Sequence, residues 1–187
     1  MKNIVILASG SGSNLQRIID CIDNGSITNA KVNLVVADRE CYALERAQNS
    51  KIPNILIPRG KNFSTELETV LSKDVDLIVL AGFLSILKPE FCNKWEDKII
   101  NIHPSLLPKF GGKGMWGHHV HEAVVNSKEK QSGATVHFVT SGIDEGDIIL
   151  QGKINVDDHD TAEDVAAKVH TVEYDIFPKA IQKVLNP

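Results

Sequence analysis

Three features are scarce in this sequence, and each scarcity excludes a class of protein. Cysteine occurs only 3 times, at Cys21, Cys41 and Cys92, and this odd, widely spaced set predicts free thiols in a reducing cytoplasm rather than a disulfide framework or a zinc site. Excess positive charge is absent, since the net charge is −4 and the pI is near 6.0, so we expect neither nucleic acid nor a membrane as a partner. Long apolar runs are absent too: residues 4–8 are soon followed by Gly10, too early for a signal peptide or a membrane span.

The apolar runs that do occur alternate with stretches of helical spacing. Residues 4–8 and 77–81 are apolar throughout, as expected of central parallel strands covered on both faces. Further strands are predicted at residues 32–37, 55–57 and 99–102, and helices at residues 15–22, 42–49, 65–71 and 88–94. The first hundred residues therefore predict an α/β fold with a mostly parallel, doubly wound sheet that is Rossmann-like in its order of elements.

The rest of the chain is organised differently. A helix is predicted at residues 117–126, and two strands joined by a turn at residues 134–139 and 148–156. Thr161 begins a capping-box pattern at the start of a long C-terminal helix, which Pro178 is expected to kink or interrupt. Because no repeat, linker or low-complexity tract is found, we predict one domain over residues 1–187.

The first candidate site is the loop Gly10-Ser11-Gly12-Ser13-Asn14, which follows a strand and opens a helix. Glycines let the backbone approach a ligand, and free amides at a helix N-terminus favour an anion, so the loop predicts a phosphate monoester site. A tight turn with a helix cap is the simpler alternative. A dinucleotide fingerprint fails because Leu15 stands where a glycine is needed, and the Lys-Ser/Thr ending of a Walker A loop is missing.

The second candidate is Asn101-Ile102-His103-Pro104, at the end of a predicted strand. Alternation places the amide of Asn101 and the imidazole of His103 on the same side of the strand, and Pro104 ends it. An amide donor beside a titratable ring suits stabilising an oxyanion while moving a proton. The alternative is that both side chains only cap the strand.

The third candidate is the acidic, glycine-rich loop over residues 140–147. One of its carboxylates, from Asp144, Glu145 or Asp147, could orient His103 and raise its pKa, and the spacing does not choose among them. An ordinary solvated turn is the alternative. The sequence also contains His118-His119-Val120-His121, but no carboxylate or cysteine stands at familiar ligand spacing, so no metal site is predicted.

These motifs occur together, and in this order, in a known family. The loop at residues 10–14, Leu80-Ala81-Gly82-Phe83, residues 101–108, residues 133–140 and Asp144 with Gly146 resemble the folate-dependent formyltransferases over residues 4–181. The resemblance implies a mostly parallel seven-stranded sheet. It also implies formyl transfer from 10-formyltetrahydrofolate to the amine of phosphoribosylglycinamide in purine biosynthesis, with small molecules as the only partners and no metal.

The resemblance assigns site residues by position. Residues 1–100 would form the phosphate-binding half, and residues 101–187 the catalytic and folate-binding half. Asn101, His103 and Asp144 would be catalytic, with Asp144 holding His103 in its working protonation state. The substrate-binding residues would be Gly12, Ser13, Asn14, Gly82, Pro104 and Glu173. The folate-binding residues would be Leu84, Ser85, Ile86, Leu87, Asn101, Val139, Thr140, Ser141, Gly142 and Ile143.

Some positions depart from the family, and some alternatives stay open. Ser85 stands where many relatives carry Arg, which affects contacts to the folate tail, and His170 stands where Gln is frequent. A formyltransferase acting on a sugar-nucleotide amine, or a non-catalytic nucleotide-binding module, would use the same loop. In a nicotinamide-dependent oxidoreductase Asp38 would be the ribose-binding acid, although Leu15 disfavours that reading. The sequence predicts no oligomeric state.

Overall fold

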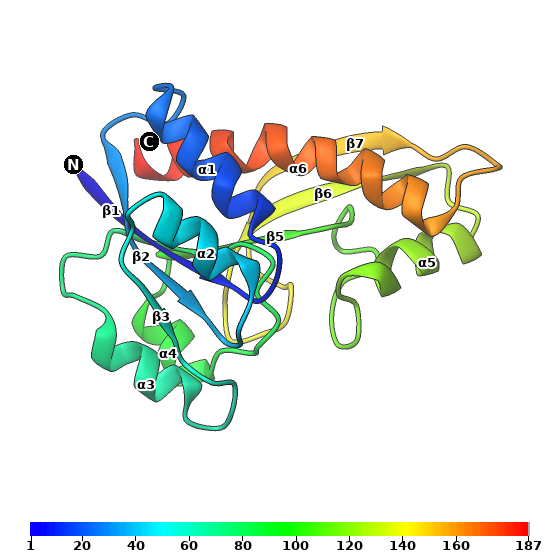
Figure 1. Ribbon diagram of the computed structural model, residues 1–187. Helices are drawn as coiled ribbons and strands as arrows, with labels where there is room; N and C mark the ends of the chain where they lie inside the picture. Colours follow the sequence, from blue (N-terminus) through cyan, green and yellow to red (C-terminus); the bar gives the residue numbers. More distant parts are fainter. Residues whose placement is uncertain (187) are drawn as a thin grey trace.

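A sheet of seven strands runs through the middle of the molecule in the computed structural model, which describes residues 1–186 (Figure 1). The strand order is β3-β2-β1-β4-β5-β6-β7, and all pairs are parallel up to β5. Strands β6 and β7 then pair antiparallel. This is the predicted single-domain, mostly parallel α/β fold. The strands are β1 Lys2–Ala8, β2 Ala30–Ala37, β3 Asn54–Leu56, β4 Leu77–Leu80, β5 Ile99–His103, β6 Gln131–Phe138 and β7 Ile148–Asn155.

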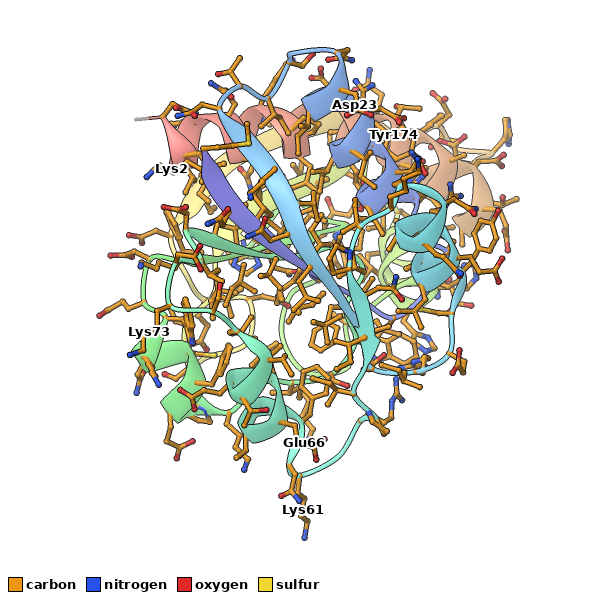
Figure 2. All side chains as sticks on the ribbon, turned by 60° about the vertical axis from the view of Figure 1, so that its left-hand side comes forward. Lys2, Asp23, Lys61, Glu66, Lys73 and Tyr174 are labelled. Atoms are coloured by element: carbon orange, nitrogen blue, oxygen red, sulfur yellow. The ribbon has the colours of Figure 1, made fainter. Side chains whose placement is uncertain are left out.

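Helices cover both faces of the sheet, which explains why its central strands are apolar throughout. Alternate residues of β1 enter two separate cores: Ile4 and Ile6 pack on one face, and Val5 and Leu7 on the other. The first core is closed by α1 Ser13–Asp23, α2 Tyr42–Asn49, α5 His118–Asn126 and α6 Ala162–Leu185, and the second by α3 Phe63–Val70 and α4 Pro89–Lys94. Charged side chains such as Lys61 and Glu66 project outward from this body (Figure 2).

The order of strands places a crevice at one edge of the sheet. The chain moves outward from β1 to β2 and β3, then returns to the other side of β1 with β4 and β5. Loops leaving the carboxyl ends of β1 and β4 therefore diverge in opposite directions, the position at which open α/β sheets bind ligands. The glycine loop follows β1, residues 81–88 follow β4, and His103 ends β5.

Helix α6 corrects one expectation from the sequence. It runs without a break from Ala162 to Leu185 and contains Pro178, so of the predicted kink or interruption, the interruption is wrong. Proline cannot donate a backbone hydrogen bond to the carbonyl four residues earlier, that of Tyr174. Arg17 of α1 supplies the missing donor, because its Nε donates to the Tyr174 carbonyl at 3.0 Å. The helix starts as predicted, with Thr161 and Asp164 forming a capping box.

Candidate active site

One cavity of about 580 Å³ occupies the crevice, and all of the predicted site residues line it. The glycine loop forms one end of the cavity, residues 82–87 and 139–143 form a second wall, and β5 contributes its last residues. The structure therefore brings together four segments that are far apart in the sequence. The predicted residues that line it are Gly12, Ser13, Asn14, Gly82, Leu84, Ser85, Ile86, Leu87, Asn101, His103, Pro104, Val139, Thr140, Ser141, Gly142, Ile143, Asp144 and Glu173.

The glycine loop requires the second of its two glycines, Gly12. Gly12 adopts a left-handed backbone conformation with φ of 69° and precedes the first turn of α1. A Cβ atom at this position would lie 2.7 Å from Cα of Ala43, so the loop packs directly on the backbone of α2. The first helical hydrogen bond runs from the amide of Gln16 to the Gly12 carbonyl, which leaves the amides of Ser13 and Asn14 without helix partners. This end of the cavity offers free N–H groups and the positive end of a helix dipole.

The side chain of Asn14 connects the loop to helix α6. Its Nδ2 donates to Glu173 Oε2 at 3.0 Å, and His170 Nδ1 lies 3.1 Å from the same oxygen. Asn14 and Glu173 are both buried. A carboxylate is therefore fixed beside the glycine loop, where it can accept hydrogen bonds from a ligand that extends from the loop.

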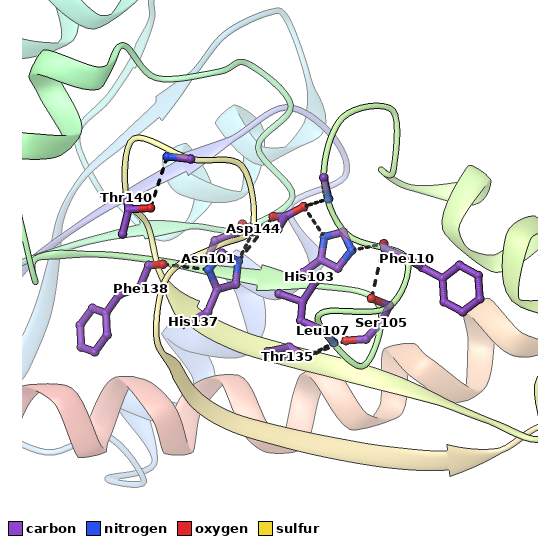
Figure 3. A network of polar contacts seen from close by, with 12 residues as sticks. Asn101, His103, Ser105, Leu107, Phe110, Thr135, His137, Phe138, Thr140 and Asp144 are labelled. Carbon is purple, nitrogen blue, oxygen red and sulfur yellow. Dashed lines mark hydrogen bonds and ion pairs between the residues drawn. The ribbon is translucent and has the colours of Figure 1, made fainter.

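At the other end of the cavity, Asn101 and His103 lie on the same side of β5, as the alternation predicts. The antiparallel register pairs Asn101 with His137 of β6, and Asn101 Nδ2 lies 3.2 Å from His137 Nε2. His137 Nδ1 lies 2.8 Å from the Phe138 carbonyl, which only accepts, so Nδ1 carries the ring proton and Nε2 accepts from Asn101. His137 therefore fixes which way the Asn101 amide points (Figure 3).

His103 is 4% exposed, and both of its ring nitrogens have neighbours. Nε2 donates to the Phe110 carbonyl at 2.8 Å, and Nδ1 lies 3.5 Å from Asp144 Oδ2. Burial lowers the pKa of His103, and this effect outweighs the opposing influence of Asp144 and the Phe110 carbonyl. Asp144 therefore raises the pKa of His103, as expected, but burial lowers it by more, so the pKa lies below its ordinary value. His103 can donate to a substrate atom only after one of its present contacts is exchanged.

Asp144 is the carboxylate of the acidic loop that reaches the histidines. Its Oδ1 lies 3.6 Å from His137 Nε2, and its Oδ2 accepts a hydrogen bond from the Gly112 amide at 2.9 Å (Figure 3). Burial alone would raise the pKa of this carboxyl, but the neighbouring imidazoles of His137 and His103 and the Gly112 amide lower it by more, so the pKa lies below its ordinary value. Asp144 is therefore an anion near neutral pH, and it connects its own loop to the loop at Gly112 and to strands β5 and β6.

A buried polar network holds the turn that follows His103. Thr135 Oγ1 donates to the Ser105 carbonyl at 2.7 Å and accepts from the Leu107 amide at 3.1 Å. Gln151 of β7 reaches the same turn, since its Nε2 donates to the Leu107 carbonyl at 3.0 Å. This network fixes residues 104–108 against β6 and β7, and with them the direction of the His103 ring.

Ser85 uses its side chain away from the cavity. Its hydroxyl donates to Asp38 Oδ2 at 2.5 Å, and the Asp38 side chain, 0% exposed, also pairs with Arg39 and Arg59 at 3.1 and 3.2 Å. Asp38 does not line the cavity. The acid that would bind a ribose in a nicotinamide-dependent enzyme is therefore occupied, which counts against that alternative.

The structure also identifies cavity residues that the sequence left without a role. His137, His121 and His170 all line the cavity, together with the loop at residues 112–117. His137 alternates with apolar residues in a predicted strand, which is a usable signal that its side chain lies at the site. Nothing in the sequence distinguishes His121 from the neighbouring His118 and His119 as a cavity residue. Within residues 1–186, no three His, Cys, Asp or Glu side chains are grouped so that they could hold a metal ion, and no helix is long and apolar enough to cross a membrane.

The sequence matches the formyl transferase family over residues 2–181, and the chain belongs to that family. Its relatives include the phosphoribosylglycinamide formyltransferase of Haemophilus influenzae, which is 40% identical over 97% of this chain and 86% of that protein. The chloroplastic phosphoribosylglycinamide formyltransferase of Vigna unguiculata is 37% identical over 97% of this chain, which spans 60% of its length. Among solved structures, glycinamide ribonucleotide transformylase 1 of Geobacillus kaustophilus superimposes with a TM-score of 0.90 at 32% identity, with 100% of both chains covered.

Proposed function

We propose that this protein transfers the formyl group of 10-formyltetrahydrofolate to the amine of phosphoribosylglycinamide, as a cytoplasmic enzyme of purine biosynthesis. The observation that carries the proposal is one cavity with the glycine loop, whose amides are free, at one end and the Asn101, His103 and Asp144 set at the other. The names of relatives at 36–40% identity support this acceptor. The three free cysteines support a reducing compartment.

The acceptor would lie with its phosphate against the amides of Ser13 and Asn14. A phosphate monoester carries two negative charges near neutral pH, and the free amides and the helix dipole favour it without a cationic side chain. Glu173 would accept hydrogen bonds from the middle of the acceptor, since it is anchored to Asn14 beside the loop. The glycinamide amine then points toward the end of β5.

The folate would occupy the wall formed by residues 84–87 and 139–143. Leu84, Ile86 and Ile143 are exposed apolar side chains that line the cavity, and a bound aromatic ring system would cover them. The side chain of Ser85 is held by Asp38, so this residue would present only its backbone to the folate.

The transfer needs a proton shuttle and hydrogen-bond donors. The amine nitrogen attacks the formyl carbon, a C–N bond forms, and the carbonyl oxygen becomes an oxyanion. Asn101 Nδ2 and His103 are the donors placed to stabilise this charge, and one such donor is typically worth about 10²–10³ in rate. The bond to the folate nitrogen then breaks, that nitrogen receives a proton equivalent to the one lost by the amine, and His103 with Asp144 would carry it.

Folate absorbance tests the proposal. The purified protein is mixed with 10-formyltetrahydrofolate, with and without phosphoribosylglycinamide, and the same assay is run on His103→Ala. We expect tetrahydrofolate to appear only with the acceptor, and turnover to be lost in the variant. Turnover without the acceptor would identify a hydrolase instead. Folate binding without turnover would identify a different acceptor, and sugar-nucleotide amines would be tested next.

A further inference from the structure

His121, on the inner side of α5, has no hydrogen-bond partner within residues 1–186, although it is only 7% exposed. Its Nδ1 is shut off from solvent and unpaired. Most buried polar side-chain atoms in proteins have a partner, because leaving one unpaired costs the full desolvation of that atom. An unpaired imidazole in the wall of a cavity therefore points to a group that binds there.

The neighbours of His121 place it between the two ends of the cavity. Helix α5 packs against α6, and His121 lines the cavity together with Glu173 of α6 and His103 of β5. Glu173 is anchored to Asn14 of the glycine loop, and the Oδ1 atom of Asn14 is a second buried atom without a partner. A ligand that runs from the glycine loop toward His103 would therefore pass the side chains of Asn14 and His121.

His121 contributes to the walls of two cavities. A second cavity of about 330 Å³ lies between α5 and α6, and His121, His170 and Glu173 line both cavities. The remaining walls of the second cavity are Ala166, Ala167 and Val169, which offer no side-chain partner to an imidazole. His121 Nε2 has no hydrogen-bond partner within residues 1–186 either, but it is not among the side-chain atoms shut off from solvent, so it is the ring nitrogen that a ligand can reach.

We propose that His121 is a further acceptor-binding residue, in which one ring nitrogen exchanges a hydrogen bond with a hydroxyl group of the acceptor's ribose. The inference rests on the function proposed above, in which the acceptor's phosphate lies at the glycine loop and its amine at β5. The ribose joins these two parts, so its hydroxyl groups lie in the stretch of the cavity that His121 lines.

The charge state of the ring fits a hydroxyl better than a phosphate. The ionisable groups that act on His121 are Glu173 from α6, His103 from β5 and His118 from its own helix. Burial outweighs the attraction of Glu173 and lowers the pKa of His121 below its ordinary value. The ring is therefore a neutral imidazole near pH 7, with one donor and one acceptor, which is the complement of a hydroxyl group.

The test combines variants of His121 with variants of the acceptor. His121→Phe removes both ring nitrogens, His121→Asn keeps a polar group near the position of Nδ1, and His121→Gln keeps one near the position of Nε2. His118→Phe is the matched control, since His118 is half-exposed on the same helix and does not line the cavity. Each protein is assayed with phosphoribosylglycinamide and with its 2′-deoxy and 3′-deoxy counterparts. Folate binding and thermal melting report on folding.

We expect His121→Phe to raise the KM for phosphoribosylglycinamide by roughly tenfold or more, with kcat, folate affinity and melting temperature nearly unchanged. One deoxy acceptor should show the same loss with the parent protein and little further loss with His121→Phe. Asn or Gln should restore part of the affinity and thereby identify the nitrogen. His118→Phe should behave like the parent.

Two results would overturn the inference alone: an active parent whose His121→Phe variant keeps its KM for the acceptor, or a variant that loses affinity equally for the ribose and both deoxy acceptors. A parent protein that transfers no formyl group to phosphoribosylglycinamide would overturn the proposed function as well, so the two failures are distinguishable. If His121→Phe does not fold, the Asn and Gln variants with the deoxy acceptors decide the matter in the same way.

Discussion

The two ends of the cavity present different kinds of atoms. At the glycine loop the groups that face a ligand are backbone amides, placed by the φ of Gly12 and by the start of α1. At the end of β5 they are side chains, Asn101 and His103, each oriented by a neighbour. A backbone amide survives every substitution except proline, so changes at the loop act through shape and charge. Changes at β5 remove a side chain that we propose takes part in the reaction.

Replacing His103 should show most clearly that the β5 end of the cavity controls the rate while the rest of the cavity controls affinity. His103→Ala removes the proposed proton carrier, and we expect kcat to fall about 10²–10⁴-fold. Acceptor and folate affinities should stay close to those of the parent, because the loop amides and the apolar wall are untouched. Steady-state kinetics and calorimetric binding measure both quantities. A near-normal kcat would remove His103 from the mechanism.

Replacing Asp144 should change the pH dependence as well as the rate. Asp144 raises the pKa of His103, so in Asp144→Asn this pKa should fall further below its ordinary value. Any limb of the pH–rate profile that reports His103 should then move to lower pH, and kcat near pH 7 should drop by about tenfold or more. Kinetics from pH 5 to 9 and histidine NMR provide the measurement. An unchanged profile would show that Asp144 does not act through His103.

Gly12 tests whether shape controls the loop end. In Gly12→Ala the new Cβ would meet the backbone of Ala43, and the residue would keep a positive φ, so we expect a loss of about 1–3 kcal/mol in stability. The acceptor KM should rise while kcat changes little. Gly10→Ala is the matched control, because a Cβ at Gly10 meets nothing within 4 Å. Equal stability of the two variants would refute the close contact with α2.

Ser13 tests whether charge controls the loop end, and here we expect the smallest effect. Ser13→Asp adds a negative charge at the start of α1, which repels a phosphate, so the acceptor KM should rise about tenfold. The same charge interacts favourably with the positive end of the helix dipole, and the first turn of α1 has no acidic residue. The melting temperature should therefore equal or exceed that of the parent protein. Ser13→Asn is the neutral control. A change in the folate KM alone would contradict the phosphate assignment.

Much of the fold could be predicted because its signals are local. The apolar runs of β1 and β4 lie in the sheet interior with both faces covered, as their composition indicates. The expected break at Pro178 failed for a non-local reason, since the carbonyl that proline leaves unpaired is satisfied by Arg17, far away in the sequence. Sequence rules for helices assume that only the helix itself can satisfy its backbone.

The residues of the candidate site could be predicted from the sequence, but the pKa values of its ionisable side chains could not. Alternation in β5 placed Asn101 and His103 together, and the resemblance selected Asp144 from three acidic candidates. The sign of the pKa shift of His103 depends on how deeply the folded chain buries it, which no local pattern encodes. The positions of His137 and His121 at the cavity could not be predicted either. They depend on the register of β6 on β5 and on the packing of α5 against α6.

Asp38 limits which new chemistries this scaffold could acquire by mutation. A glycine at position 15 would complete the sequence pattern of a dinucleotide fingerprint. The acid needed at the end of β2, however, is already enclosed by two arginines and by Ser85 from the segment after β4. Releasing Asp38 would leave both guanidinium groups and a serine in need of partners. Converting this scaffold from formyl transfer to redox chemistry would therefore require several simultaneous substitutions. This holds even though the two chemistries occupy the same crevice in related architectures.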